Sequence, residues 1–507
     1  MADESFAPLL RTARRRARLE RWQRLLLRPL RPTRLVPDRP GPPNLLLVGV
    51  DTLRADHTGF GGCPLPTTPR LDRLAARGTV FSDVTAPAPW TLPSFAGALS
   101  GLMPGLHGAY LPGPERNMDT QPPQRLQDGT RTLAAHLAAR GYRTAAFYSN
   151  QFFAFGLAET CGEHRYLNLP AGDLAEAALD WVRRHGDRPF FCFVLFNDPH
   201  EPTTPPATDL APFLPDLRRA GADVSPAALA ALARWGEPPA PHLGRVPLPL
   251  DPAAAAALAL KKAIYAATVR QVDRAIGSMQ DKLEAWRLAD RTVVSVFSDH
   301  GEEFLDHAAE GHRWGHDPRG LVGIGHGHSH FQELLHVPWA TWGPGVPRGR
   351  RITAPVSLLD LAPTLADWVQ AGPLTPGQGR PLPAGALARS LVGRSRADGA
   401  GEDAGTTPLL AEAIAYGPDL VMVRRGRWKL IARRDGEPLA LYDLGADPGE
   451  RHDCRDERPQ ELAQLRQVVE AWRASGCGAA GGGDGGAGWG DVDATVRQRL
   501  KDLGYAD

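Results

Sequence analysis

The sequence is poor in cysteine and nearly balanced in charge. It has five cysteines among 507 residues, and none of them has the CxxC spacing of a zinc knuckle or a redox pair. A small, odd number of cysteines argues against a disulfide scaffold and is typical of a reducing compartment. The formal net charge of +1 argues against a dedicated nucleic-acid-binding protein, which needs a clustered positive excess that this chain has only at its start. We therefore expect no nucleic-acid partner.

Long apolar runs are also missing. No stretch has the length of a signal-peptide core or of a bilayer span, so we expect a cytoplasmic location. Residues 1–43 form an arginine-rich extension whose leucines and Trp22 could make the apolar stripe of one helix, followed by a proline-rich linker. We expect this basic helix to pack on its own protein or on a partner. Peripheral contact with an anionic membrane surface is the alternative.

What the sequence does contain is a series of short, continuous apolar runs separated by helical patterns. The runs are "NLLLVGV" at 44–50, "RTAAFYS" at 143–149, "PFFCFVLF" at 189–196 and "RTVVSVF" at 291–297. Such runs are typical of strands buried on both faces. The alternation predicts an α/β fold, in which helices flank a large, mostly parallel sheet.

Composition divides the rest of the chain. The α/β domain is expected over 44–392, with an insertion of irregular structure and short helices at about 203–262 that could cover the site. Residues 408–474 predict a small α+β subdomain with an antiparallel hairpin turning at 434–436. A glycine-rich linker and a short helical tail fill 475–507.

Polar residues follow each of the four apolar runs. They are Asp51, Asn150, Asp198 with His200, and Asp299 with His300. The carboxyl ends of parallel strands meet at one edge of a sheet, so these residues should converge. Carboxylates and an imidazole there could hold one divalent cation, Ca²⁺, Mg²⁺, Mn²⁺ or Zn²⁺. The alternative for each aspartate alone is that it caps the helix that follows.

A second candidate is the stretch "APAPWTLPSFAGALSG", which places Thr91 just before an expected helix start at Pro93 or Ser94. A hydroxyl in the positive field of a helix N-terminus lies where an anionic ester is also favoured. Metal coordination would make this hydroxyl a nucleophile. An ordinary threonine N-cap is the alternative.

A third candidate is "GIGHGHSHFQELLHVP", which contains His326, His328, His330 and His336. Glycines between histidines let the backbone approach a ligand, and imidazoles can donate to an oxyanion or protonate a leaving group. We favour His328 for this role and His326 second. The remaining histidines are expected at the surface.

Seven stretches, in order, resemble the sulfatase family of the alkaline phosphatase superfamily over residues 44–472. They are "NLLLVGVDTLRADHTGF", "TTPRLDRLAARGTVFSDVTAPAPWTLPS", "NDPHEP", "YAATVRQVDRAIGSM", "SDHGEEFLDH", "GHGHSHFQELLHVPW" and "GRWKLI" with "LYDLGADPGE". The resemblance implies a large mixed sheet with a small C-terminal antiparallel sheet plus helix. It also implies a hydrolase acting on a small anionic ester, in which one divalent metal ion assists the reaction.

The resemblance further implies roles for individual residues. The cation would be held by the residues matching Asp51, Asp299 and His300, and Thr91 matches the nucleophile. His200 and His328 would stabilise the oxyanion and protonate the leaving group, while Asn150 and His326 would contact the substrate.

The chain departs from the family pattern at two places. Sulfatases carry Cys or Ser in a Cys/Ser-x-Pro-x-Arg motif that becomes formylglycine, whereas this chain reads Thr91-Leu92-Pro93-Ser94-Phe95. No formylglycine is therefore expected. Thr52 stands where many sulfatases have a second acidic metal ligand.

These departures favour one substrate class. A threonine ester lacks the second hydroxyl with which formylglycine hydrate expels sulfate, so water must cleave it. Phospho- and phosphono-esters are therefore favoured over sulfate esters. The alternatives are a catalytically inactive binding protein and a transferase that passes a phosphoryl group from Thr91 to another acceptor.

Overall fold

The computed structural model describes residues 41–238, 240–314, 317–374, 407–474, 492 and 494–502. The predicted basic helix, the segment 375–406 and the glycine-rich linker lie outside the described residues. Within the described part of the chain, no helix combines the length and hydropathy that crossing a bilayer requires.

The core of the protein is an eight-stranded mixed sheet with the order β12-β2-β11-β8-β1-β7-β5-β6. Its strands are β1 (Asn44–Val50), β2 (Thr79–Phe81), β5 (Arg143–Tyr148), β6 (Glu163–Tyr166), β7 (Phe190–Phe196), β8 (Thr292–Ser298), β11 (Trp339–Trp342) and β12 (Arg350–Ile352). The four predicted apolar runs are β8, β1, β7 and β5, which are neighbours and all parallel. Only β11 runs antiparallel to its neighbours, β8 and β2. The predicted fold class is confirmed.

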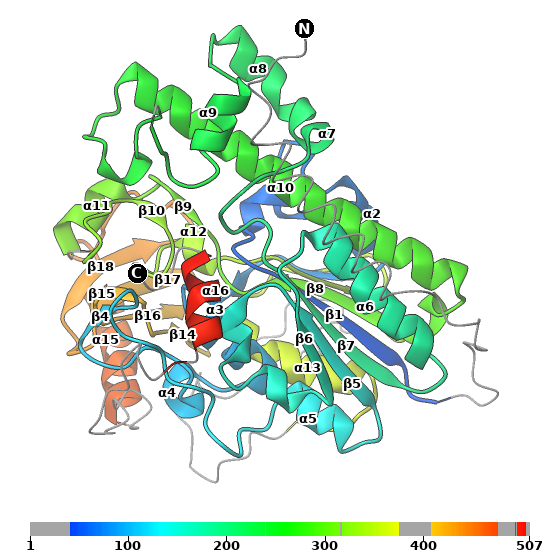
Figure 1. Ribbon diagram of the computed structural model, residues 1–507. Helices are drawn as coiled ribbons and strands as arrows, with labels where there is room; N and C mark the ends of the chain where they lie inside the picture. Colours follow the sequence, from blue (N-terminus) through cyan, green and yellow to red (C-terminus); the bar gives the residue numbers. More distant parts are fainter. Residues whose placement is uncertain are drawn as a thin grey trace, which may run out of the picture.

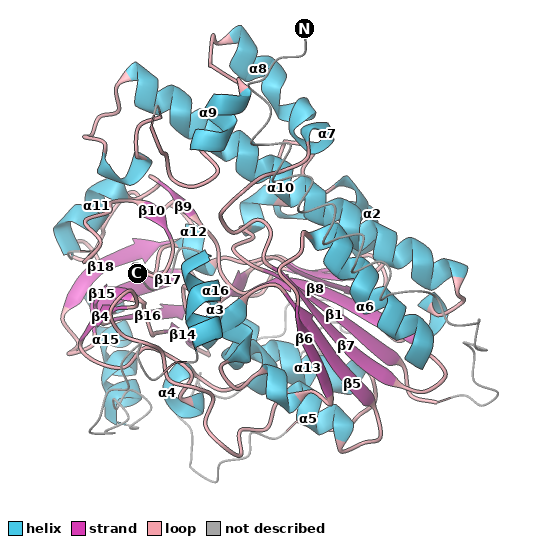
Figure 2. Ribbon diagram, viewed as in Figure 1, coloured by secondary structure: helices cyan, strands magenta, loops and turns pink. Residues whose placement is uncertain are grey.

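Helices cover both faces of this sheet (Figure 2). Alternate residues of β1 belong to two different cores, with Leu45 and Leu47 in one and Leu46 and Val48 in the other. The first core includes α3 (Thr91–Ser100), α5 (Leu133–Ala138) and α13 (Leu361–Trp368). The second includes α2 (Pro69–Ala75), α6 (Ala171–His185) and α10 (Pro252–Ala285). Burial on both faces explains why the strands read as continuous apolar runs.

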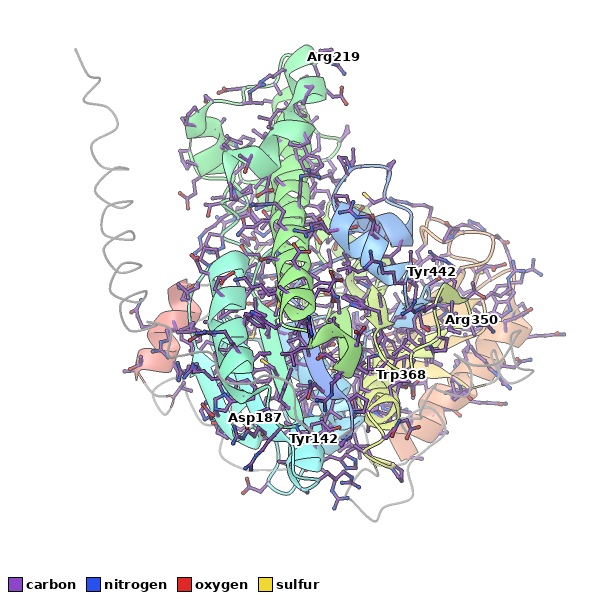
Figure 3. The ribbon with its side chains drawn as sticks, turned by 90° about the vertical axis from the view of Figure 1, so that its right-hand side faces the viewer. Tyr142, Asp187, Arg219, Arg350, Trp368 and Tyr442 are labelled. Carbon is purple, nitrogen blue, oxygen red and sulfur yellow. The ribbon has the colours of Figure 1, made fainter. Side chains whose placement is uncertain are left out.

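The insertion is shorter than expected. Its short helices are α7 (Ala207–Leu210), α8 (Leu214–Arg219) and α9 (Pro226–Ala231), and the 34-residue helix α10 already begins at Pro252. Asp251 caps α10 by accepting a hydrogen bond from the Ala254 N–H at 2.8 Å. In Figure 3, Arg219 of the insertion lies at the opposite end of the molecule from Tyr142 and Asp187, which precede β5 and β7. The insertion therefore rises on the side of the sheet where the parallel strands end.

A four-stranded antiparallel sheet forms the C-terminal subdomain, beside the main sheet in Figure 1. Its strands are β14 (Leu409–Ala411), β16 (Leu420–Arg425), β17 (Trp428–Arg433) and β18 (Pro438–Asp443), and α15 (Pro459–Ala474) packs on them. The predicted hairpin turn at 434–436 joins β17 to β18, with Gly436 at a φ of 97°. The expected small C-terminal antiparallel sheet is therefore confirmed.

Shorter elements complete the described chain. The two-stranded sheets pair β3 (Val84–Thr85) with β13 (Val356–Ser357), β4 (Glu115–Asn117) with β15 (Tyr416–Pro418), and β9 (Glu303–Phe304) with β10 (Ile324–Gly325). The remaining α-helices are α4 (Pro104–His107), α11 (Ala308–Trp314), α12 (Gln332–Leu335) and α16 (Ala494–Asp502). The 3-10 helices are η2 (Ala55–His57), η3 (Gly59–Gly61), η4 (Gln151–Ala154), η5 (Ala158–Thr160), η6 (Ala211–Phe213), η7 (Leu243–Arg245), η8 (Ala289–Arg291) and η9 (Leu358–Asp360). Helix α16 is part of the predicted helical tail and returns to the catalytic domain, where Arg499 hydrogen-bonds Gln151.

Candidate active site

Three buried ligand groups meet where β1 and β8 end. Asp51 follows β1, while Asp299 and His300 follow β8, and all three are fully buried. The Nε2 atom of His300 lies 3.4 Å from Asp51 Oδ1 and 3.3 Å from Asp299 Oδ2. One ligand atom from each residue falls within 4.8 Å of the others. The strand register brings them together, because Val50 is paired with Ser298.

The protonation of these groups fits a divalent cation. His300 Nδ1 donates to the Gly301 carbonyl at 2.9 Å, which leaves the lone pair on Nε2 facing the two carboxylates. Burial lowers the pKa of His300 well below its ordinary value, so the ring is neutral. Burial raises the pKa of Asp51 to about 8, and burial together with Asp51 raises the pKa of Asp299 well above its ordinary range. Asp51 Oδ1 and Asp299 Oδ2 have no hydrogen-bond partner. Such unpaired buried oxygens around an imidazole lone pair suit a bound cation.

Asn150 holds the other oxygen of Asp51. Its Nδ2 donates to Asp51 Oδ2 at 2.5 Å, and its Oδ1 accepts from the Phe152 N–H at 2.9 Å at the start of η4. The amide is therefore fixed at both ends and orients the carboxylate. The substrate contact expected of Asn150 stays a prediction.

Thr91 is the first residue of α3, so the helix begins two residues before the predicted start at Pro93. The N-cap is Trp90 in extended conformation, and no side chain caps the helix. The alternative in which Thr91 is a simple N-cap is therefore wrong. Its hydroxyl lies 3.4 Å from His300 Nε2 and also interacts with Asp51. The Ser94 hydroxyl donates to the Asp299 carbonyl at 2.6 Å and fixes the first turn of α3 against the end of β8.

Phe95 occupies the motif position at which sulfatases carry arginine. Its ring makes edge contacts with Phe153, Phe193 and Phe297, and it is 1% exposed. A side chain at Gly49 of β1 would meet the Phe95 ring at 2.7 Å. The position therefore belongs to the core of the domain and offers no polar group to a substrate.

Two histidines flank the three ligand groups. The ring centroid of His326 lies 4.5 Å from that of His300 and 5.0 Å from that of His200. His200 Nδ1 donates to the Glu201 carbonyl at 2.6 Å, and His326 Nδ1 contacts Glu302 Oε2 at 3.2 Å. Burial lowers the pKa of both His200 and His326 to about 3, so both rings are neutral. They can therefore donate or accept a hydrogen bond without adding charge.

His328 has different surroundings. Its Nε2 contacts Glu303 Oε2 at 2.7 Å, and it lines a cavity of about 230 Å³ beside Tyr416 and Trp314. Although burial favours the neutral ring, the hydrogen bond and charge of Glu303 raise the pKa of His328. Within the described residues, no hydrogen bond or ring contact joins His328 to the three ligand groups. Its role in protonating a leaving group stays a prediction.

Other expected residues have structural contacts. Asp198 accepts hydrogen bonds from the Ala171 N–H at 2.9 Å, at the start of α6, and from Gln271 at 3.3 Å. Asp198 therefore binds the first turn of α6, which precedes it in the chain, and does not cap the helix that follows it. His336 contacts the Ser82 carbonyl at 2.9 Å, and His330 is fully buried, so His330 is not the surface residue that was expected.

Sequence reasoning missed three residues that shape the site, which are Tyr265, Ser298 and Glu302. It noted Thr52 only as a departure from the family pattern. Glu302 was visible in "SDHGEE", but its pairing with His326 depends on the β9–β10 ribbon, which has no local signal. A residue with a positive φ such as Thr52, at 55°, has no signal in the sequence either.

A family model described as Sulfatase matches residues 43–371, which is more than half of the chain. The chain belongs to the sulfatase family. It is a sulfatase-family hydrolase that acts on ester bonds, as the resemblance implied. A choline-sulfatase from Rhizobium meliloti is 26% identical over 465 residues, which cover 80% of this chain and 81% of that relative.

Solved structures share the fold of this sulfatase-family chain. A phosphonate monoester hydrolase of Agrobacterium radiobacter superposes with a TM-score of 0.63 at 20% identity, covering 86% of this chain and 96% of that structure. A protein in complex with its substrate D-glucosamine-2-N,6-O-disulfate gives a TM-score of 0.66 at 18% identity, covering 86% and 98%. The relatives therefore include proteins acting on sulfated and on phosphonate esters.

Proposed function

We propose that this hydrolase cleaves a phospho- or phosphono-ester through a covalent ester on Thr91, with the help of one divalent cation. The observation that carries the proposal is the Thr91 hydroxyl at the first position of α3, 3.4 Å from His300 Nε2. A cation held by Asp51, Asp299 and His300 would supply Lewis-acid stabilisation of negative charge. The three ligand residues follow two neighbouring strands, so rigid elements hold them in place.

Each residue of the site contributes a separate step. Thr91 releases its hydroxyl proton to water, and Oγ1 then bonds to phosphorus as the bond to the leaving alkoxide breaks. The positive field at the N-terminus of α3 would stabilise both the ionised hydroxyl and the anionic ester. Asn150 keeps the Asp51 carboxylate oriented. His200 and His326 hydrogen-bond the oxygens of the ester as charge develops on them. His328 is proposed to give a proton to the leaving alkoxide, and water then cleaves the threonine ester.

The substrate preference follows from the chemistry of threonine. Phe95 is packed among aromatic rings, and the motif for formylglycine formation is absent. Without a geminal hydroxyl, Thr91 cannot expel the bound group by itself. A phosphorus ester on threonine is open to attack by water, and the likeness in fold to phosphonate monoester hydrolases agrees with that preference. A sulfate ester is the second candidate, because the choline-sulfatase relative spans most of the chain.

The test compares nitrophenyl esters of phosphate, phenylphosphonate and sulfate, with Mn²⁺, Mg²⁺, Ca²⁺ or Zn²⁺ added. Replacing Thr91 with Ala should lower turnover of the preferred ester by at least ~10³, about 4 kcal/mol in barrier, while Thr91→Ser keeps part of it. Thr132→Ala is the matched control, because Thr132 also stands at a helix start but accepts from the Ala135 N–H as an N-cap. It should lose about 1 kcal/mol of stability and no activity.

The outcomes separate the alternatives. Near-normal turnover by Thr91→Ala would refute the covalent mechanism. An inactive wild-type protein that still binds the anions would indicate the binding protein. Product release with an added alcohol as acceptor, and not with water, would indicate the transferase.

A further inference from the structure

Ser298 is the last residue of β8 and directly precedes two of the three ligand groups. Its side chain is fully buried. The hydroxyl oxygen lies 2.7 Å from the Val50 carbonyl and 2.8 Å from the His300 carbonyl, and it accepts from the Leu53 N–H at 2.9 Å. One side chain therefore contacts the backbone on both sides of Asp51 and that of His300.

These contacts matter because the sheet ladder ends at this point. Val50 and Ser298 are the last paired residues of β1 and β8, and the Asp51 N–H bonds the Phe196 carbonyl of β7, on the opposite side of β1. Beyond that register, the strand ladder no longer joins the loop that carries Asp51 to the loop that carries Asp299. A hydroxyl has one proton and two lone pairs, so Ser298 can accept from one loop while donating to a carbonyl. It therefore links the two loops.

The turn after Asp51 has to be held in place. Thr52 has a φ of 55°, a left-handed conformation that β-branched residues avoid. A second buried hydroxyl supports this turn, since Tyr265 of α10 donates to the Thr52 carbonyl at 2.6 Å and accepts from the Arg54 N–H at 3.0 Å. Ser298 and Tyr265 thus hold the same strained turn from two elements.

We propose that Ser298 is a positioning residue that sets the spacing between Asp51 and the Asp299–His300 pair, and thereby the affinity for the divalent cation, with Tyr265 supporting it. The inference rests on the proposed metal site. Beyond Val50 and Ser298 the strand ladder no longer joins β1 to β8, so the Ser298 hydroxyl connects the two loops that carry the ligand set. Ser298 supplies that link without being a ligand.

Strand β8 contains a matched control for this role. Ser295 is buried in the same strand, where its hydroxyl lies 2.8 Å from Thr341 Oγ1 and accepts from Trp339 Nε1 at 3.1 Å. Both serines therefore lose buried hydrogen bonds when they are replaced by alanine. Only Ser298 touches the loops that carry the ligands.

The experiment titrates Mn²⁺ alone into the full chain by calorimetry, with thermal unfolding as a second readout. Ser298→Ala should weaken Mn²⁺ binding at least tenfold, and Tyr265→Phe about threefold. Ser295→Ala should lower the unfolding temperature but leave the affinity within a factor of two. At saturating Mn²⁺, turnover by Ser298→Ala should return to within about threefold of wild type, because the residue does not touch substrate.

Each outcome decides the proposal. Unchanged Mn²⁺ affinity in Ser298→Ala overturns it while leaving the metal site intact. If Ser298→Ala does not fold, wild-type affinity in Tyr265→Phe overturns it instead. Equal losses of affinity in Ser295→Ala and Ser298→Ala would mean a general effect of destabilisation and would also overturn it. A wild-type protein that binds no divalent cation refutes the proposed metal site, and this inference with it.

Discussion

Two buried clusters in this protein have the same composition, one histidine and two carboxylates, and opposite electrostatics. In the first, Asp51 and Asp299 face the unprotonated nitrogen of His300, and one oxygen of each carboxylate has no partner. The second consists of His307, Glu333 and Glu450.

In the second cluster every charge is matched. His307 Nδ1 contacts Glu333 at 2.6 Å, and its Nε2 donates to the Gly449 carbonyl at 3.1 Å. Glu450 pairs with the buried Lys429 of β17 at 2.6 Å and accepts from the Gln332 N–H at 2.6 Å. This cluster joins the C-terminal subdomain to the catalytic domain. A set of ligand-type residues therefore indicates a cation only where no positively charged side chain balances its carboxylates.

The strongest test of the difference between the two clusters is to count the bound metal ions. Asp299→Asn should abolish binding of Mn²⁺ and lower ester turnover by about 10⁴, about 5.5 kcal/mol in barrier, because a ligand and its charge are lost. Glu333→Gln, the matched change in the second cluster, should keep one equivalent of bound Mn²⁺ by calorimetry. Two equivalents in wild type and one in Glu333→Gln would show that the second cluster also binds metal.

The next prediction tests the ion pair in the second cluster. Lys429→Met should cost about 3–5 kcal/mol in the free energy of unfolding, because it leaves the Glu450 carboxylate buried without its cation. Urea unfolding measures the loss, and the double variant Lys429→Met/Glu450→Gln should recover part of it. A loss below about 1 kcal/mol in the single variant would mean that Glu450 does not depend on Lys429.

A smaller effect should appear in the pH dependence of stability. Burial alone favours neutral His307, but the hydrogen bond and charge of Glu333, with Glu450, raise its pKa to about 9. The folded pKa lies above the unfolded value of about 6.5, so this contribution is complete below about pH 6.5 and is lost as pH rises through about 9. Unfolding of wild type and His307→Gln at pH 6 and pH 9.5 should show a difference that shrinks by about 1–3 kcal/mol. A constant difference would mean that folding does not raise the pKa of His307.

The sequence indicates the central sheet and the polar strand ends well, and the outer strands poorly. Strands β1, β5, β7 and β8 are continuous apolar runs, so each can be identified as a strand from its own residues alone. Strand β2 has only three residues, and its pairing with β11 and β12 depends on distant segments. Residues that follow a predicted strand could therefore be placed at one edge, which is why Asp51, Asp299 and His300 were found together.

Two errors came from competing local rules. Proline favours the first position of a helix, so Pro93 suggested the start, yet proline is tolerated throughout the first turn and α3 begins at Thr91. Helix α10 does begin at a proline, Pro252, with Asp251 as its N-cap. The prediction instead placed its first turns in the insertion at about 203–262, because both are rich in Ala and Leu. The different surroundings of His326 and His328 could not be predicted, because each depends on a carboxylate 24 or 25 residues away.

The packing of Phe95 limits the routes by which this chain could acquire the formylglycine motif. Gly49 leaves room for the Phe95 ring on the sheet, and three further phenylalanine rings surround it. An arginine placed there to rebuild the formylglycine motif would bury a guanidinium among phenylalanine rings, which cannot pair with its charge. Restoring the motif therefore demands several coordinated core substitutions. In evolutionary terms, this packing opposes a return to the formylglycine motif.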